Sequence, residues 1–151
     1  SIVTFLQEKE GLDYKQVNDL LNKQSGYMGV SGLTSDQRDL TDAAQKGNDR
    51  AQLALDIQRY QLKKYIGSYA AAMGGLDAVV FTGGIGENAG TTRALACEGL
   101  EFMGIKIDPA RNDKHGDAFE ITTDDSTVKV WVIATNEELL IARDTRDIVE
   151  K

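Results

Sequence analysis

Apolar positions recur at helical spacing through the first half of the chain. The spacing predicts three helices, at about residues 1–10, 13–23 and 48–73. Asp13, with Gln16 three residues later, has the pattern of a capping box and supports the start of the second helix. Residues 26–35 are rich in Gly, Ser and Thr, so we expect a loop there. In the long third helix the residues that recur at helical spacing are Leu55, Leu62, Ile66, Tyr69 and Met73.

The second half alternates short β-branched runs with helical stretches. The run DAVVFT, residues 77–82, is typical of a strand buried on both faces, and it passes directly into GGIGEN. We expect a helix from about Asn88 to Glu98, and a final helix started by a capping box between Thr135 and Glu138. Other strand-like runs cover residues 105–107, 119–122 and 128–133. This alternation predicts an α/β fold.

Composition and charge narrow the classes of function. The chain has 151 residues, the length of one average domain, with 41% hydrophobic and 27% charged residues, which excludes disordered and membrane-spanning proteins. Its net charge is −7, so we expect neither a nucleic-acid partner nor an anionic membrane. The single cysteine, Cys97, lies among small apolar residues, and we expect it to be buried in a cytoplasmic protein.

The glycines after the run DAVVFT are the most informative feature. A strand followed by Gly83–Asn88 and then a helix permits a tight turn, and it allows a phosphate or sugar to approach the backbone closely. Glycines at this place can also serve packing alone. A Gly-Lys-Ser/Thr phosphate loop does not occur in the sequence. The glycines are therefore compatible with a nucleotide site of another type and equally with packing alone.

Other interpretations stay open at this point. Gly84, Gly86 and Ala89, with Asp108 about 20 residues later, fit the relaxed fingerprint of a domain that binds a dinucleotide such as NAD. A non-catalytic dimerisation module is a third possibility. His115 has no cysteine or second histidine with which to build a zinc site. Glu137, in the first turn of the last helix, can simply offset the helix dipole.

Three long segments resemble acetate kinases. They are LLNKQSGYMGVSGLTSDQRDL, LDAVVFTGGIGENAGTTRALACEGLEFMGIKID and WVIATNEELLIARDT, and they occur in the order found in that family. The resemblance implies an RNase-H-like α/β domain of the actin-like ATPase superfamily. It also implies transfer of a phosphoryl group between ATP and acetate, giving acetyl phosphate and ADP, with Mg²⁺.

The resemblance assigns roles to residues of this chain. The run Asp36, Gln37 and Arg38 would lie beside the adenosine, and Glu137 would be linked to magnesium. The wall of the adenine pocket would be formed by Gly84, Ile85, Gly86, Glu87 and Asn88.

The family's amino-terminal motifs do not occur in these 151 residues. Neither Asn-x-Gly-Ser-Ser-Ser-x-Lys nor Thr-Arg-Ser-Gly-Asp is found, and residue 1 is Ser. We therefore expect the carboxyl-terminal portion of a longer enzyme, with no catalytic residue in this chain and no activity of its own. Residues 1–136 would belong to the nucleotide-binding domain, and residues 137–151 would form a helix that docks on the amino-terminal domain. The resemblance also implies a homodimer.

Overall fold

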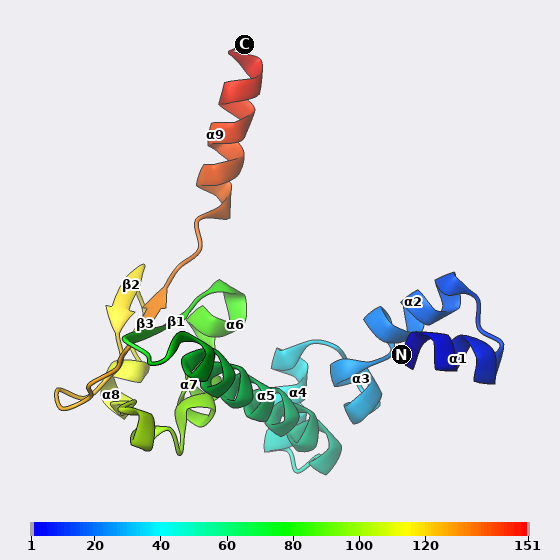
Figure 1. Ribbon diagram of the computed structural model, residues 1–151, viewed down its shortest axis with the longest axis horizontal. Helices are drawn as coiled ribbons and strands as arrows, with labels where there is room; N and C mark the ends of the chain where they lie inside the picture. Colours follow the sequence, from blue (N-terminus) through cyan, green and yellow to red (C-terminus); the bar gives the residue numbers. More distant parts are fainter. Residues whose placement is uncertain (1, 151) are drawn as a thin grey trace. The chain divides into compact units, whose positions relative to one another are not determined.

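The computed structural model describes residues 2–150. The chain divides into two compact units, Ser1–Gln61 and Leu62–Lys151, and each is described by itself. The boundary falls within the longest helix, α5 (Asp49–Met73). Mixed helices and strands confirm the predicted α/β class (Figure 1).

The first unit is helical. It contains the first part of α5 and four shorter helices, α1 (Ile2–Glu10), α2 (Tyr14–Lys23), α3 (Gly26–Ser31) and α4 (Gln37–Gln45). The predicted capping box is confirmed, because the Asp13 carboxylate accepts from the Gln16 N–H at 2.9 Å and the Gln16 side chain accepts from the Asp13 N–H at 2.8 Å. Asn48 caps α5 through the N–H groups of Arg50 and Ala51. The core of this unit consists of Leu40, Ala51, Ala54 and Leu55.

The prediction of a loop over residues 26–35 is wrong for its first part, which forms α3. Tyr27 and Val30 pack against the core around Leu40, and this tertiary contact outweighs the low helix propensity of the glycines. Gly32 ends the helix in the left-handed region at φ 67° and donates its N–H to the Met28 carbonyl. The Gly, Ser and Thr content of residues 26–35 predicted a loop, and it could not reveal this packing.

The second unit is built on a small sheet with strand order β1-β3-β2 (Figure 1). β1 (Ala78–Phe81) pairs in parallel with β3 (Lys129–Ile133), and β3 pairs antiparallel with β2 (Ala118–Glu120). Between β1 and β2 lie α6 (Gly83–Asn88), α7 (Gly90–Cys97), a 3₁₀ turn at Glu101–Met103 and α8 (Pro109–Asn112). Residues 105–107, predicted as a strand, make only isolated bridges to Val128 and Thr122.

One face of this sheet is covered and the other is open. Phe81, Val130 and Val132 are buried with Cys97 in the core of the second unit. In β1, Val80 is 51% exposed, so the prediction of a strand buried on both faces is wrong. Burial is confirmed for Cys97, and it raises the pKa of the thiol to about 12.

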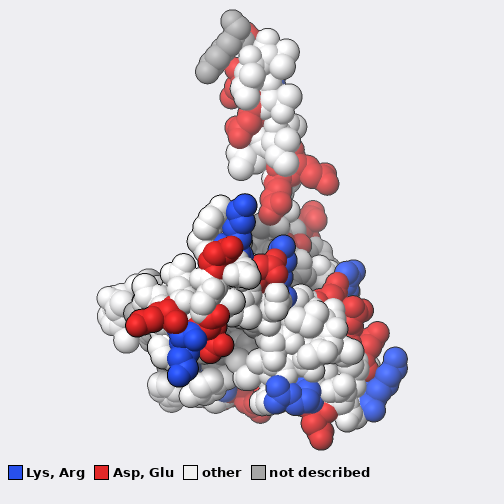
Figure 2. Space-filling model, turned by 90° about the vertical axis from the view of Figure 1, so that its right-hand side faces the viewer, with Lys and Arg blue, Asp and Glu red and all other residues white. Residues whose placement is uncertain are grey.

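The last helix, α9 (Glu137–Val149), is exposed along its whole length. Its apolar side chains include Leu140 at 61% and Ile148 at 74% exposure. Figure 2 shows α9 at the top, where acidic side chains lie beside uncharged ones. Tyr69 and Met73 of α5 are also exposed. Within residues 2–150, no helix has the length and apolar character needed to cross a bilayer.

Candidate functional site

The glycine segment after β1 is a short helix rather than an open turn. α6 begins at Gly83, whose φ of 71° lies in the left-handed region, and it ends at Asn88. Gly86 lies against the end of β1, because a Cβ on it would come within 3.1 Å of the Phe81 carbonyl carbon. The helix predicted from Asn88 starts only at Gly90, as α7. The glycines thus let one helical turn pack directly on the strand end.

The outer side of α6 is open. A Cβ placed on Gly84 would meet no atom within 4 Å, and Ile85 is 40% exposed. The Asn88 side chain donates to the Gly84 carbonyl at 2.9 Å, which ties the last residue of the helix to its second residue. α6 therefore presents bare backbone beside an exposed apolar side chain, a surface on which a flat ring can lie.

A buried arginine, which the sequence analysis missed, supports α6 from beneath. Arg93 of α7 is 2% exposed, and its Nη1 donates to the carbonyls of Gly86 and Glu87 at 2.7 and 2.9 Å. Its Nε and Nη2 donate to the side chain and the carbonyl of Asn112, and the Asn112 amide donates to the Gly90 carbonyl. Burial lowers the pKa of the Arg93 guanidinium. Arg93 and Asn112 thus fix α6, α7 and α8 to one another.

The segment Asp36–Arg38 lies in the first unit, at the start of α4. The Asp36 carboxylate caps this helix by accepting from the Arg38 N–H at 2.8 Å. It also accepts from Nε and Nη2 of the Arg38 side chain at 3.1 and 2.6 Å. This pairing with Arg38 lowers the pKa of Asp36 to about 2. The two side chains form an exposed, charge-balanced pair.

Neighbouring side chains support that pair. The Tyr27 hydroxyl donates to the Gln37 side chain at 3.0 Å, and the Thr34 hydroxyl accepts from the Asp36 N–H at 3.1 Å. The Tyr27 phenol is protonated at neutral pH, and desolvation raises its pKa further, to about 12. The conformation at the start of α4 is thus tied to α3 through Tyr27 and Gln37.

The polar side chains at the carboxyl end of β3 are arranged differently from the prediction. Thr135 does not cap α9, because its N–H and hydroxyl donate to the Glu87 carboxylate at 2.9 and 3.0 Å. These two bonds lower the pKa of Glu87. Asn136 caps α9 instead, accepting from the Leu139 N–H at 3.0 Å. Glu137 follows as the first residue of α9 and is exposed.

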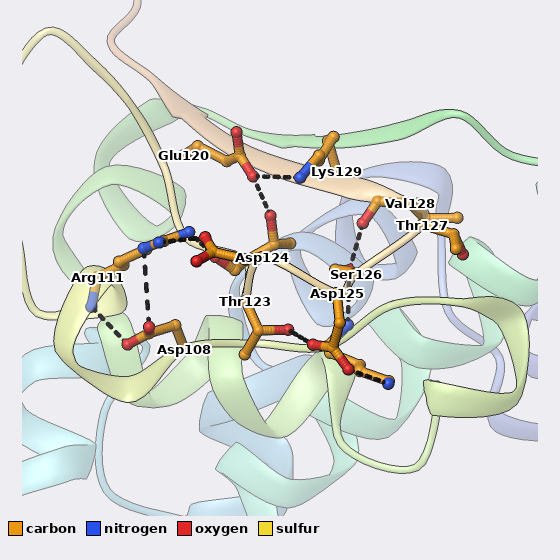
Figure 3. Close-up of polar contacts among 12 residues, drawn as sticks. Asp108, Arg111, Glu120, Thr123, Asp124, Asp125, Ser126, Thr127, Val128 and Lys129 are labelled. Carbon is orange, nitrogen blue, oxygen red and sulfur yellow. Dashed lines mark hydrogen bonds and ion pairs between the residues drawn. The ribbon is translucent and has the colours of Figure 1, made fainter.

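Asp108 caps the amino-terminal end of α8. Its carboxylate accepts from the N–H groups of Ala110 and Arg111 at 2.8 and 3.1 Å and lies 3.7 Å from the Arg111 guanidinium. Arg111 also pairs with Asp124, and Glu120 pairs with Lys129 at 3.0 Å (Figure 3). The acid that a dinucleotide site would need is therefore engaged within a network that stabilises α8 and the strand connection. The dinucleotide interpretation is not favoured.

Acidic and histidine side chains do not gather into a metal centre in the described part of the chain. Among residues 2–150, no group of three or more His, Cys, Asp or Glu side chains could hold a metal ion. His115 is exposed in the connection between α8 and β2.

Comparisons with known proteins agree over nearly the whole chain. A sequence model of the Acetokinase family matches residues 1–143. The chain is 57% identical to an acetate kinase of Alkaliphilus metalliredigens over 149 residues, which are 99% of this chain and 38% of that protein. It is 54% identical to an acetate kinase of Methanosarcina thermophila over 150 residues, covering 99% of this chain and 37% of the relative. The chain thus spans less than two fifths of the length of these relatives.

Solved structures give the same result. The crystal structure of Porphyromonas gingivalis acetate kinase matches 98% of this chain with a TM-score of 0.88 and 49% identity, over 37% of its own length. A propionate kinase from Francisella tularensis matches 93% of this chain with a TM-score of 0.82 and 38% identity, over 36% of its own length.

Proposed function

The chain belongs to the acetokinase family, and we propose that it supplies the nucleotide-binding part of an acetate kinase. The observation that carries this proposal is 57% identity to an acetate kinase over 99% of the chain. The proposed reaction transfers a phosphoryl group between ATP and acetate, giving acetyl phosphate and ADP. It is proposed for the full-length enzyme, by which we mean this chain together with the further length that its relatives have.

In this proposal α6 forms one wall of the adenine pocket. Gly84 supports this role because nothing lies within 4 Å of the place a Cβ would take, so a flat ring can approach the backbone. Ile85 offers an exposed apolar side chain against the ring, and Asn88 holds the Gly84 carbonyl in place. Gly86 and Glu87 complete the wall, and Arg93 holds their carbonyls in place by donating hydrogen bonds to them.

Asp36, Gln37 and Arg38 are proposed to lie beside the adenosine. The Asp36 carboxylate is ionised at neutral pH, and Arg38 lowers its pKa further, so it can accept hydrogen bonds from ribose hydroxyls. Its pairing with Arg38 supports this role, because it holds the acceptor oxygens in place before the nucleotide arrives.

Glu137 is proposed to be linked to magnesium. Magnesium normally keeps several waters and uses one or two carboxylates with phosphate oxygens, so a single exposed carboxylate fits it. When bound with the nucleotide, Mg²⁺ would neutralise charge on the phosphates. Glu137 would contribute an oxygen ligand, directly or through water.

The remaining parts of the proposal concern the full-length enzyme. We expect its catalytic residues in the amino-terminal part, so that this chain alone transfers no phosphoryl group. α9 would dock on the amino-terminal domain with the apolar side chains that it exposes here, and the enzyme would be a cytoplasmic homodimer. Acetate is the proposed acyl substrate. Propionate is the alternative substrate, because the structure of a propionate kinase matches this chain.

The proposal is tested by trapping acyl phosphate with hydroxylamine. The full-length enzyme should form acetyl phosphate from ATP, acetate and Mg²⁺, and the 151-residue chain should form none. A parallel assay with propionate compares the two acids by kcat/KM. Failure of the full-length enzyme to form either acyl phosphate would overturn the proposed reaction. Turnover by the chain alone would overturn the placing of the catalytic residues.

A further inference from the structure

Glu87 and Thr135 join two segments that are 48 residues apart in sequence. Glu87 belongs to α6, and Thr135 lies in the connection that leads from β3 past α6 to α9 (Figure 1). One oxygen of the carboxylate, Oε1, accepts both the Thr135 N–H at 2.9 Å and the Thr135 hydroxyl at 3.0 Å. Bonds to an ionised acceptor are about twice as strong as bonds between neutral groups. The contact is therefore strong for a pair at the surface.

This contact precedes α9 by two residues. Ala134 donates its N–H to the Asp117 carbonyl at 2.8 Å, so the chain is tied to the start of β2 just before Thr135. Asn136 then caps α9, and Glu137 follows. Every residue of α9 is exposed, so packing within this unit does little to hold the helix. The polar contacts of residues 134–136 therefore set where α9 begins.

The Glu87 carboxylate thus connects α6 with the segment that leads into α9, and the proposed function gives these two helices different roles. α6 is the proposed adenine wall, and the first residue of α9 is the proposed magnesium-linked carboxylate. The α6 end of this link is rigid, because Arg93 holds the Gly86 and Glu87 carbonyls and is itself 2% exposed. The Glu87 carboxylate thus holds the connection before α9 from a fixed position on α6.

We propose that Glu87 is a positioning residue, whose contact with Thr135 holds Glu137 in a fixed relation to α6. This inference rests on the proposed function of α6 and Glu137. It assigns the Glu87 side chain to α9 rather than to the nucleotide, while its backbone remains part of the adenine wall. The consequence is that Glu87 affects the magnesium requirement more strongly than the affinity for ATP.

Hydrogen exchange tests the contact itself. In the full-length enzyme, exchange measured by mass spectrometry over residues 134–139 should accelerate by at least about tenfold in Glu87→Ala, as expected for the loss of a hydrogen bond to a charged group. Glu87→Gln keeps an acceptor oxygen and should retain part of the protection. Glu98→Ala, which removes an exposed carboxylate at the end of α7, is the matched control and should exchange like the wild type. Unchanged exchange in Glu87→Ala would overturn the inference.

Kinetics tests the positioning. Glu87→Ala should raise the Mg²⁺ concentration for half-maximal turnover by about tenfold, and the KM for ATP by no more than about twofold. Glu87→Gln should restore much of the wild-type requirement. Faster exchange with an unchanged magnesium requirement would overturn the positioning role and leave the proposed function standing. An unchanged requirement in Glu137→Gln would instead overturn the proposed role of Glu137, and the inference with it.

Discussion

Gly86 lies against Phe81 so closely that a Cβ on this glycine would come within 3.1 Å of the Phe81 carbonyl carbon. Backbone at the end of β1 cannot move aside as a flexible side chain could. Gly86→Ala should therefore destabilise the chain by about 1–3 kcal/mol. The measurement is the free energy of unfolding in urea.

Gly84→Ala is the matched control for that substitution. Gly84 lies in the same helical turn, and a Cβ there would meet no atom within 4 Å. Because alanine restricts the unfolded chain more than glycine does, Gly84→Ala should be neutral or stabilising by up to about 1 kcal/mol. Equal destabilisation by the two substitutions would contradict the close packing of Gly86 on β1.

Arg93→Lys should cost about 2–4 kcal/mol of unfolding free energy although it keeps the charge. A lysine cannot reach the four acceptors that the guanidinium serves, so buried carbonyls and the Asn112 side chain would lose their partners. Arg143→Lys, on the exposed α9, serves as the control and should change stability by less than about 0.5 kcal/mol. A similar small effect at Arg93 would show that these hydrogen bonds are not formed in solution.

Asp36 should titrate near pH 2 in the chain, as followed by NMR of its carboxyl carbon. Its pKa lies below the ordinary value of 3.8, so the ion pair with Arg38 is complete above about pH 4 and is lost as pH falls through about 2. In Arg38→Ala the midpoint should rise toward 3.8. A wild-type midpoint already near 3.8 would mean that the pair does not form.

Local signals were enough where the interacting residues are close in sequence. The capping box of Asp13 and Gln16 was predicted correctly because its two members are three residues apart. Thr135 and Glu138 have the same pattern, but the prediction there is wrong. The Thr135 hydroxyl binds Glu87, 48 residues away, and Asn136 takes over the cap. A pattern in sequence cannot show which of two available partners the fold brings nearer.

In the candidate site, too, the features that depend on neighbouring residues were predicted and those that depend on distant residues were not. The position of α6 was predicted from the run of β-branched residues followed by glycines, because both are signals between neighbouring residues. Arg93 was not found, because three of its four acceptors are backbone carbonyls, which carry no sequence signature, and the fourth is the side chain of Asn112, 19 residues away. The only available signal was a charged residue on a face of α7 shared with buried Ala96 and Cys97.

Glu137→Gln in the full-length enzyme separates a metal ligand from a residue that only offsets the helix dipole. If Glu137 is a magnesium ligand, the substitution should lower Mg²⁺-dependent turnover by at least about tenfold. The free energy of unfolding should fall by no more than about 1 kcal/mol. Glu138→Gln removes the same charge from the same turn and gives the stability cost of the dipole alone. Proportional losses of stability and turnover in Glu137→Gln would favour the dipole role.

The most direct test of the nucleotide site is hydrogen exchange of the full-length enzyme with and without saturating ADP. ADP should slow exchange over residues 83–88 and 36–38, and NAD at the same concentration should not. Alanine at Asp36 should weaken the protection of both segments. Protection confined to other parts of the enzyme, or equal protection by NAD that is lost in Asp108→Ala, would contradict the assignment of α6 and Asp36–Arg38 to adenosine.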